Sequence, residues 1–188
     1  GTYSGTNTNG GSNVAGMNLQ QIAIGQSTAP GSHSFSAGNY FSLSATNSGT
    51  DSSTGAGGDA VGNVSADQIT FFTPVALGNR ANIAIENSGS YSGQASSTYV
   101  NVGSTGGGQI NCYSSVSVGD DFALSVSNSG TNTGSGLGGY FIGDIINGQQ
   151  VRFQNTFSAG NNASFVITNN GSNSSNTINS NQVGDRKS

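Results

Sequence analysis

The stretch Phe41-Ser42-Leu43-Ser44-Ala45-Thr46-Asn47-Ser48-Gly49-Thr50 indicates how the chain folds, because related stretches recur along it. Its closing tetrad begins at 47, 87, 128 and 169, so the steps are 40, 41 and 41 residues. A Gly-Asn or Gly-Asp pair recurs with the same period at 38, 78, 119 and 160. A Gln followed by Ile or Val does so at 68, 109 and 150, with an earlier copy at 21. Three markers that share one period predict a repeat architecture.

Each repeat divides into three segments with β-strand patterns. The first segment alternates apolar residues with small or polar ones, as in Phe122, Leu124 and Val126, which predicts a half-buried strand. A Gly-rich loop follows, and then a second strand at 60–64, 99–102 and 140–146. The third strand runs from the Gln to the Gly, at 68–77, 109–118 and 150–159. The Gly-Asn or Gly-Asp pair then turns the chain with residues that tolerate positive φ. No segment has the apolar spacing and caps of a helix.

These strands predict an all-β fold, a parallel β-solenoid (β-helix) of about four 41-residue coils with three short strands per coil. An antiparallel β-sandwich or a small propeller-like ring would use the same strands. Stacked coils explain more, because they give a reason for the same amide to recur at the same place in every repeat. The predicted ladders of hydrogen-bonded amides consist of Asn47, Asn87, Asn128 and Asn169, and of Gln21, Gln68, Gln109 and Gln150.

The Asn and Gln ladders resemble those of secreted β-solenoid surface proteins, namely adhesin passengers and curli-like functional amyloids. The resemblance is architectural, covers the repeat region and does not include the curli repeat motif. We treat 1–188 as a single repeat domain with partial unit 1–40, units 41–80, 81–121 and 122–162, and partial unit 163–188.

The composition indicates a folded, secreted protein. Only 6% of the residues are charged, against roughly 25% in typical soluble domains. Four basic residues exclude a basic stripe for nucleic acid, and no apolar run reaches the roughly 18 residues of a membrane span. The chain starts at Gly1 and its single Met is Met17, which points to a removed secretory signal and an extracellular or cell-surface location. Asn-x-Ser sequons, which permit glycosylation there, stand at Asn63, Asn162, Asn170 and Asn173.

No residue cluster predicts catalysis, a cofactor or a metal. His33, the single histidine, falls in the inward register of Thr73, which predicts a hydrogen-bonded polar column inside the third strand. Cys112 falls in the column of Phe71 and Phe153, which predicts a small buried hydrophobe. One His and one Cys exclude a zinc cluster. A weaker alternative is a calcium site formed by Asp120 and Asp121 with Asp144 or Asp59. We therefore expect a protein that is not an enzyme.

The two ends of the chain predict its function. The segment 3–6, with Tyr3 and Gly5, matches the recurring tetrad, so the first unit lacks its first strand. The last unit contains that strand, with Phe165 and Ile167, and its Val183 stands 14 residues after Asn169, as Ile142 does after Asn128. Such ends could complement each other strand by strand between two copies of the chain. They therefore predict a structural protein that binds its own copies and stacks head to tail into an extracellular filament or matrix. The alternative arrangements are an end buried by another part of a larger parent protein and closure within one chain into a ring.

Two other functions compete with the filament. The first is an adhesin or glycan-binding module of a larger surface protein, which would contact a surface glycan through Gly/Ser-rich loops or through Phe72 and Tyr113. The second, ice binding, has less support because a column that contains Thr46 and Thr168 is interrupted by Glu86 and Ser127.

Overall fold

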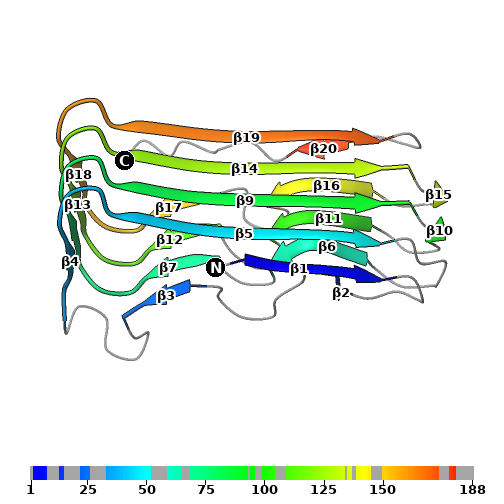
Figure 1. Ribbon diagram of the computed structural model, residues 1–188, viewed down its shortest axis with the longest axis horizontal. Coiled ribbons are helices and arrows are strands. Elements are labelled where there is room, and N and C mark those ends of the chain that lie inside the picture. Colours follow the sequence, from blue (N-terminus) through cyan, green and yellow to red (C-terminus); the bar gives the residue numbers. More distant parts are fainter. Residues whose placement is uncertain are drawn as a thin grey trace.

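The computed structural model describes residues 2–7, 13–14, 22–25, 33–51, 59–64, 68–92, 94–95, 99–104, 109–133, 135–136, 139–144, 150–173 and 178–180. In this part of the chain the regular secondary structure is entirely β-strand, and every strand pair is parallel. The described residues contain no helix that could span a membrane. The strands wind into coils that stack one on another (Figure 1), so the predicted parallel β-solenoid is confirmed and the antiparallel alternative is wrong.

Among the described residues, four sheets of four or five strands run along the stack, and a fifth sheet has two strands. The long sheet consists of β1 (Thr2–Asn7), β5 (Ser42–Asp51), β9 (Asn82–Tyr91), β14 (Ala123–Asn132) and β19 (Ser164–Asn173). The return sheet consists of β2 (Asn13–Val14), β6 (Asp59–Val64), β11 (Tyr99–Ser104), β16 (Gly139–Asp144) and β20 (Ile178–Ser180). The opposing sheet consists of β3 (Ile22–Ile24), β7 (Ile69–Phe71), β12 (Ile110–Cys112) and β17 (Val151–Phe153). The side sheet consists of β4 (Phe35–Ala37), β8 (Val75–Leu77), β13 (Val116–Val118) and β18 (Phe157–Ala159).

Each coil adds one strand to each sheet. Coil I consists of β3, β4, β5 and β6, and coils II, III and IV begin at β7, β12 and β17. The short strands β10 (Gln94–Ala95) and β15 (Ser135–Gly136) pair between coils II and III. Below coil I, β1 and β2 extend only the long and the return sheet. The long strands of the long sheet and those of the return sheet run in opposite directions, which gives the coil a flattened cross-section (Figure 1).

The third predicted strand differs from the structure, because it is two strands in two sheets. In coil II the chain leaves the opposing sheet after Phe71, turns through Thr73 and Pro74, and enters the side sheet at Val75. Pro74 has no N–H to donate to a neighbouring strand, and its ring fixes φ, so this position suits a corner better than a strand centre. Among the described residues, each coil therefore has one strand in each of four sheets where the sequence pattern predicts three, and coils II and III also contain the short strands β10 and β15.

The apolar core lies between the first half of the long sheet, the opposing sheet and the side sheet. The predicted alternation in β14 is confirmed, since Leu124 and Val126 are buried while Ala123 and Ser125 point outward and are half-buried. Burying a side chain of this size stabilises the fold by about 1.5–3 kcal/mol. The completely buried large residues of the core include Phe71, Phe122, Ile69, Ile85 and Ile110.

The corner between the side sheet and the long sheet stacks tightly. Positive φ falls one residue after the predicted Gly-Asn or Gly-Asp pair, at Tyr40, Arg80, Asp121 and Asn162, with φ between 57° and 63°. The Asn or Asp side chain of the pair instead accepts a hydrogen bond from the backbone of the next coil. Asn39 Oδ1 accepts from Asn79 N at 2.9 Å, and Asn79 Oδ1 accepts from Asp120 N at 2.9 Å. The adjacent glycine leaves room for this bond, because a Cβ on Gly119 would lie 2.8 Å from Asn79 N.

We predict that Gly119→Ala destabilises the protein by about 1–3 kcal/mol, the usual cost of forcing an extra carbon into a packed site. Gly38→Ala is the matched control, since a Cβ at Gly38 meets nothing within 4 Å. Urea unfolding monitored by circular dichroism measures both variants. Equal destabilisation by the two substitutions would show that the close approach between coils does not require glycine.

Candidate functional site

The predicted Asn ladder is present in the interior of the solenoid. Nδ2 of Asn47 donates to Oδ1 of Asn87 at 2.9 Å, and Asn87 donates in the same way to Asn128 at 2.7 Å. Asn128 then donates to Asn169 at 2.8 Å. Every bond of this column therefore points from coil I toward coil IV.

The Gln ladder runs parallel to the Asn ladder with the opposite hydrogen-bond direction. Nε2 of Gln150 donates to Oε1 of Gln109 at 2.7 Å, and Gln109 donates to Gln68 at 2.9 Å. Gln21, the earlier copy in the sequence, lies outside the described residues. The two columns thus form antiparallel chains of amide dipoles along the solenoid axis.

Reciprocal amide pairs join the two columns within a coil, a feature that the sequence analysis missed. Gln68 donates to Asn87 at 2.8 Å and Asn87 donates back at 2.9 Å. Gln109 and Asn128 exchange bonds of 2.7 and 3.0 Å, and Gln150 and Asn169 exchange bonds of 2.9 and 3.0 Å. The constant separation of 19 residues between the partners is the sequence signal that predicts this pairing.

The amides of Asn87, Gln109 and Asn128, in coils II and III, have all of their hydrogen-bonding groups satisfied. Asn87 donates two bonds, to Gln68 and Asn128, and accepts two, from Asn47 and Gln68. A primary amide has two N–H donors and one carbonyl oxygen with two lone pairs, so this set is complete. Each pair connects the long sheet with the opposing sheet within one coil, whereas the bonds along the columns fix the position of one coil on the next.

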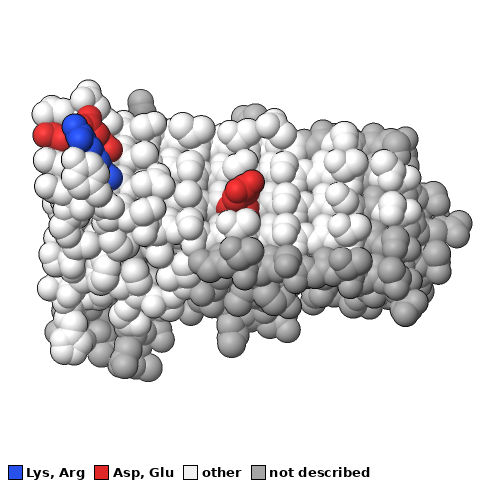
Figure 2. All heavy atoms as spheres, viewed as in Figure 1, with Lys and Arg blue, Asp and Glu red and all other residues white. Residues whose placement is uncertain are grey.

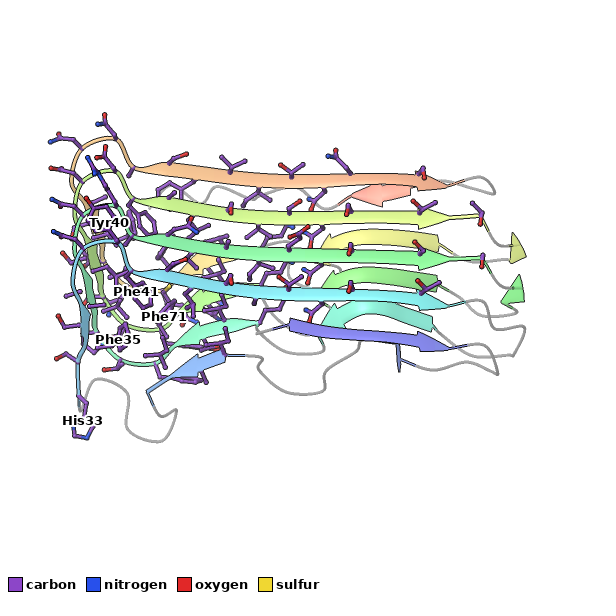
Figure 3. All side chains as sticks on the ribbon, viewed as in Figure 1. His33, Phe35, Tyr40, Phe41 and Phe71 are labelled. Atoms are coloured by element: carbon purple, nitrogen blue, oxygen red, sulfur yellow. The ribbon has the colours of Figure 1, made fainter. Side chains whose placement is uncertain are left out.

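His33 does not occupy the predicted polar column. Its side chain is exposed and points away from the coils (Figure 3). Within that register Thr73 is buried, but Ser114 is half-buried and Asn155 is exposed. The reason is the corner between the opposing and side sheets, which turns these residues out of the strand in which the sequence pattern placed them.

Cys112 lies in the predicted core column, between its register partners Phe71 and Phe153. It is buried, and this burial raises the pKa of its thiol from 9.0 to about 12. A thiol in such an environment behaves as a small hydrophobic group and not as a nucleophile or a ligand.

The acidic residues at the corner contact polar neighbours. Asp120 Oδ1 accepts from Asn161 N at 2.6 Å, and Asp121 lies 3.6 Å from Nε of Arg80. Much of the charge on this face of the molecule gathers at that corner (Figure 2). Among the residues that the structure describes, no group of three His, Cys, Asp or Glu could hold a metal ion. The side chains of Asp59 and Asp144 lie outside that description.

The aromatic residues considered for glycan contact differ in exposure. Phe72 is only 9% exposed, so the expectation of an exposed Phe72 is wrong, whereas Tyr113 is 39% exposed. Their rings stack at 5.1 Å with an interplanar angle of 13°, so Phe72 covers one face of Tyr113. These rings do not form an open aromatic platform.

The interruption of the Thr column is confirmed. Four register partners on successive strands of the long sheet form this column, namely Thr46, Glu86, Ser127 and Thr168.

The sequon residues Asn162 and Asn170 are exposed on coil IV, and Nδ2 of Asn162 donates to Oδ1 of Asp121 at 3.1 Å. Asn63 lies in β6 and Asn173 in β19, and their side chains lie outside the described part.

The ends of the solenoid differ from the predicted complementary ends. Tyr3 and Gly5 do pair in register with Asn47 and Gly49, as their tetrad predicts. At the other end, however, coil IV has a strand in all four sheets, and β20 pairs Ser180 with Ile142. The prediction that Val183 takes this place is wrong, and Val183 lies outside the described residues. Both ends thus contain strands of the long and return sheets, so they overlap and do not complete one coil.

Coil IV exposes apolar side chains that inner coils bury. Phe165 is 46% exposed, whereas its register partner Leu124 in coil III is 2% exposed. Phe165 contacts the rings of Phe157 and Phe153 at centroid distances of 5.3 and 6.2 Å. Together with the partly buried Ile167, they form an apolar surface along β17, β18 and β19, which we name the C-terminal face.

Comparison of the chain with protein-family models, curated proteins and solved structures gives no match.

We predict that Asn87→Ala destabilises the fold by on the order of 3 kcal/mol, because each buried polar group that loses its partner costs about 1–3 kcal/mol. The substitution removes the acceptor of both Asn47 and Gln68. Asn82→Ala is the control, since Asn82 lies on the same strand but points outward, and it should change stability by less than about 0.5 kcal/mol. Chemical unfolding measures the stability of both variants. If Asn87→Ala lost as little stability as Asn82→Ala, the ladder would not have the predicted stabilising role.

We also predict that stability falls in alkaline solution because of Cys112. The thiol ionises at an ordinary pKa of 9.0 when unfolded and at about 12 when folded. The protonated thiol therefore makes its full contribution to the free energy of unfolding below pH 9. As pH rises from 9 toward 12 this contribution is lost, and the free energy of unfolding falls by up to about 1.4 kcal/mol per pH unit. Unfolding free energies of wild type and Cys112→Ala across this range isolate the effect. If the unfolding free energies of the two proteins changed in parallel with pH, the predicted role of Cys112 would be wrong.

Proposed function

We propose that the chain is a secreted structural protein that self-assembles end to end, coil on coil, into an extracellular filament or matrix. The observation that carries the proposal is the C-terminal face. There, Phe165 is 46% exposed in a column in which coils II and III bury Ile83 and Leu124. Covering this face with a further coil would remove that apolar surface from water, which favours association.

The backbone of the same face supports strand addition. Ser164 N donates to Phe122 O of coil III, so the backbone groups of the alternate residues Phe165 and Ile167 point to the other side of β19. Among the described residues no strand pairs on that side of β17, β18 or β19. Exposed strand edges of this kind template pairing with another chain. The partner that fits most directly is a second copy, because its coils carry the same strands in the same order.

Features of the sequence support an extracellular location for the proposed assembly. Low charge, Asn-x-Ser sequons and the architectural resemblance to secreted solenoids agree with an extracellular matrix. Two of the sequon residues, Asn162 and Asn170, are exposed and therefore accessible to glycosylation.

We predict that the purified chain forms long particles of uniform width as its concentration rises, and that Phe165→Asp abolishes them. A charge on the inward side of an edge strand would be buried without a partner in the stack. Val166→Asp is the matched control, because Val166 is exposed on the outward face of the same strand and should leave assembly intact. Electron microscopy and light scattering measure the length distribution.

Fibre diffraction of the assembled material should give an axial spacing of about 4.8 Å, the distance between paired strands. Wild-type protein that stays monodisperse at every concentration would contradict the proposal. So would a Phe165→Asp variant that assembles as wild type does.

A further inference from the structure

The two ends of the solenoid match strand for strand once β1 and β2 are set aside. The C-terminal end presents β17, β18 and β19 with 3, 3 and 10 residues. The lower edge of coil I presents β3, β4 and β5 with the same 3, 3 and 10 residues. In both coils a strand of the return sheet follows, β20 or β6.

Direct stacking of these two ends would also continue the interior columns. The register of the inner coils would place Phe165 of one copy beside Leu43 of the next, and Phe157 beside Phe35. It would place Asn169 beside Asn47, with the donor direction that Asn47, Asn87 and Asn128 already share. The apolar surface and the Asn ladder would thus both extend across the junction.

The segments β1 and β2, which we name the N-terminal plug, occupy part of this site. β1 pairs with the second half of β5, from Thr46 to Asp51, and β2 pairs with Ala60 and Val61 of β6. Among the described residues, nothing pairs with the lower edges of β3, β4 or the first half of β5. The plug therefore covers only one side of the lower end.

A second copy cannot bury the C-terminal face while the plug stays in place. If β19 of one copy rested on β1 of the next, the plug would hold the remaining strands one layer apart, a gap of about 4.8 Å. Phe165 and Phe157 lie on the side where that gap would open, since the plug has no strand in the opposing or side sheet. Flush stacking closes the gap, but it requires the long-sheet edge that β1 occupies.

We infer that the N-terminal plug competes with a second copy of this chain for the lower edge of coil I, and that end-to-end assembly proceeds by displacement of the plug. The inference rests on the proposed function. The incoming copy offers ten paired residues along β5, where β1 offers six. It also pairs with β3 and β4, and it brings Asn169 to the position next to Asn47 where the plug has Tyr3. When a second copy displaces the plug, the partial pairing of β5 with β1 is therefore replaced by pairing along the whole length of β5.

A reversible cross-link tests this in the 188-residue chain. Ser4 of the plug and Ser48 of β5 are register partners, and neighbouring strands lie about 4.8 Å apart, which a disulfide can bridge. The test variant carries Ser4→Cys with Ser48→Cys. The control carries Ser88→Cys with Ser129→Cys, which joins the register partners on β9 and β14 and leaves the plug free. Cys112 is buried and remains in both variants.

We predict that the oxidised Ser4/Ser48 variant loses assembly and regains it when the disulfide is reduced, whereas the control assembles in both states. Light scattering measures assembly, thiol titration verifies the cross-link, and far-ultraviolet circular dichroism verifies that each protein is folded. If the oxidised test variant assembles as fast as wild type, the plug inference is wrong and self-assembly stands. If wild type and both reduced variants fail to assemble, self-assembly itself is wrong and the inference falls with it.

Discussion

The structure depends on buried side-chain amides that satisfy one another only when the coils are in register. A buried amide that loses its partners is costly, and strand side chains alternate between faces. A slip of one residue would turn Asn87 outward and bring Ser88 to the interior. The network therefore fixes the axial order of the coils more strictly than the apolar residues could. Its links within a coil, such as that between Gln68 and Asn87, also hold the two layers of the flattened cross-section together.

Stacking in register also explains the unusual composition. A residue that recurs in every coil lies one strand spacing from its own copies, and like charges at that distance repel by about 1 kcal/mol even in water. Repeated amides, hydroxyls and glycines avoid this cost. Two charges share a column at the corner, and they are opposite: Arg80, which also contacts the ring of Tyr40, is followed by Asp121. The 6% content of charged residues thus follows from the architecture.

The sequence predicted the features that repeat and missed those that depend on the path of the chain. The period, the parallel stacking, both ladders and the core position of Cys112 follow from spacing and alternation, since stacked positions must share a register. The corner at Thr73 and Pro74 did not follow, because the apolar alternation continues on both sides of it. The position of β20 was missed because the loop lengths change there. The exposure of Phe165 depends on what lies above its coil, and no pattern within the chain encodes that.

The equivalence of the coils has a consequence for how such a protein can change in length. Loss or duplication of the segment between any position and its counterpart in the next coil removes or adds one complete coil. Every column then still contains the residue type it requires, and only the number of layers differs. Unequal recombination within the gene would therefore yield shorter and longer proteins with the same cross-section, and natural variation in this lineage should proceed by whole coils.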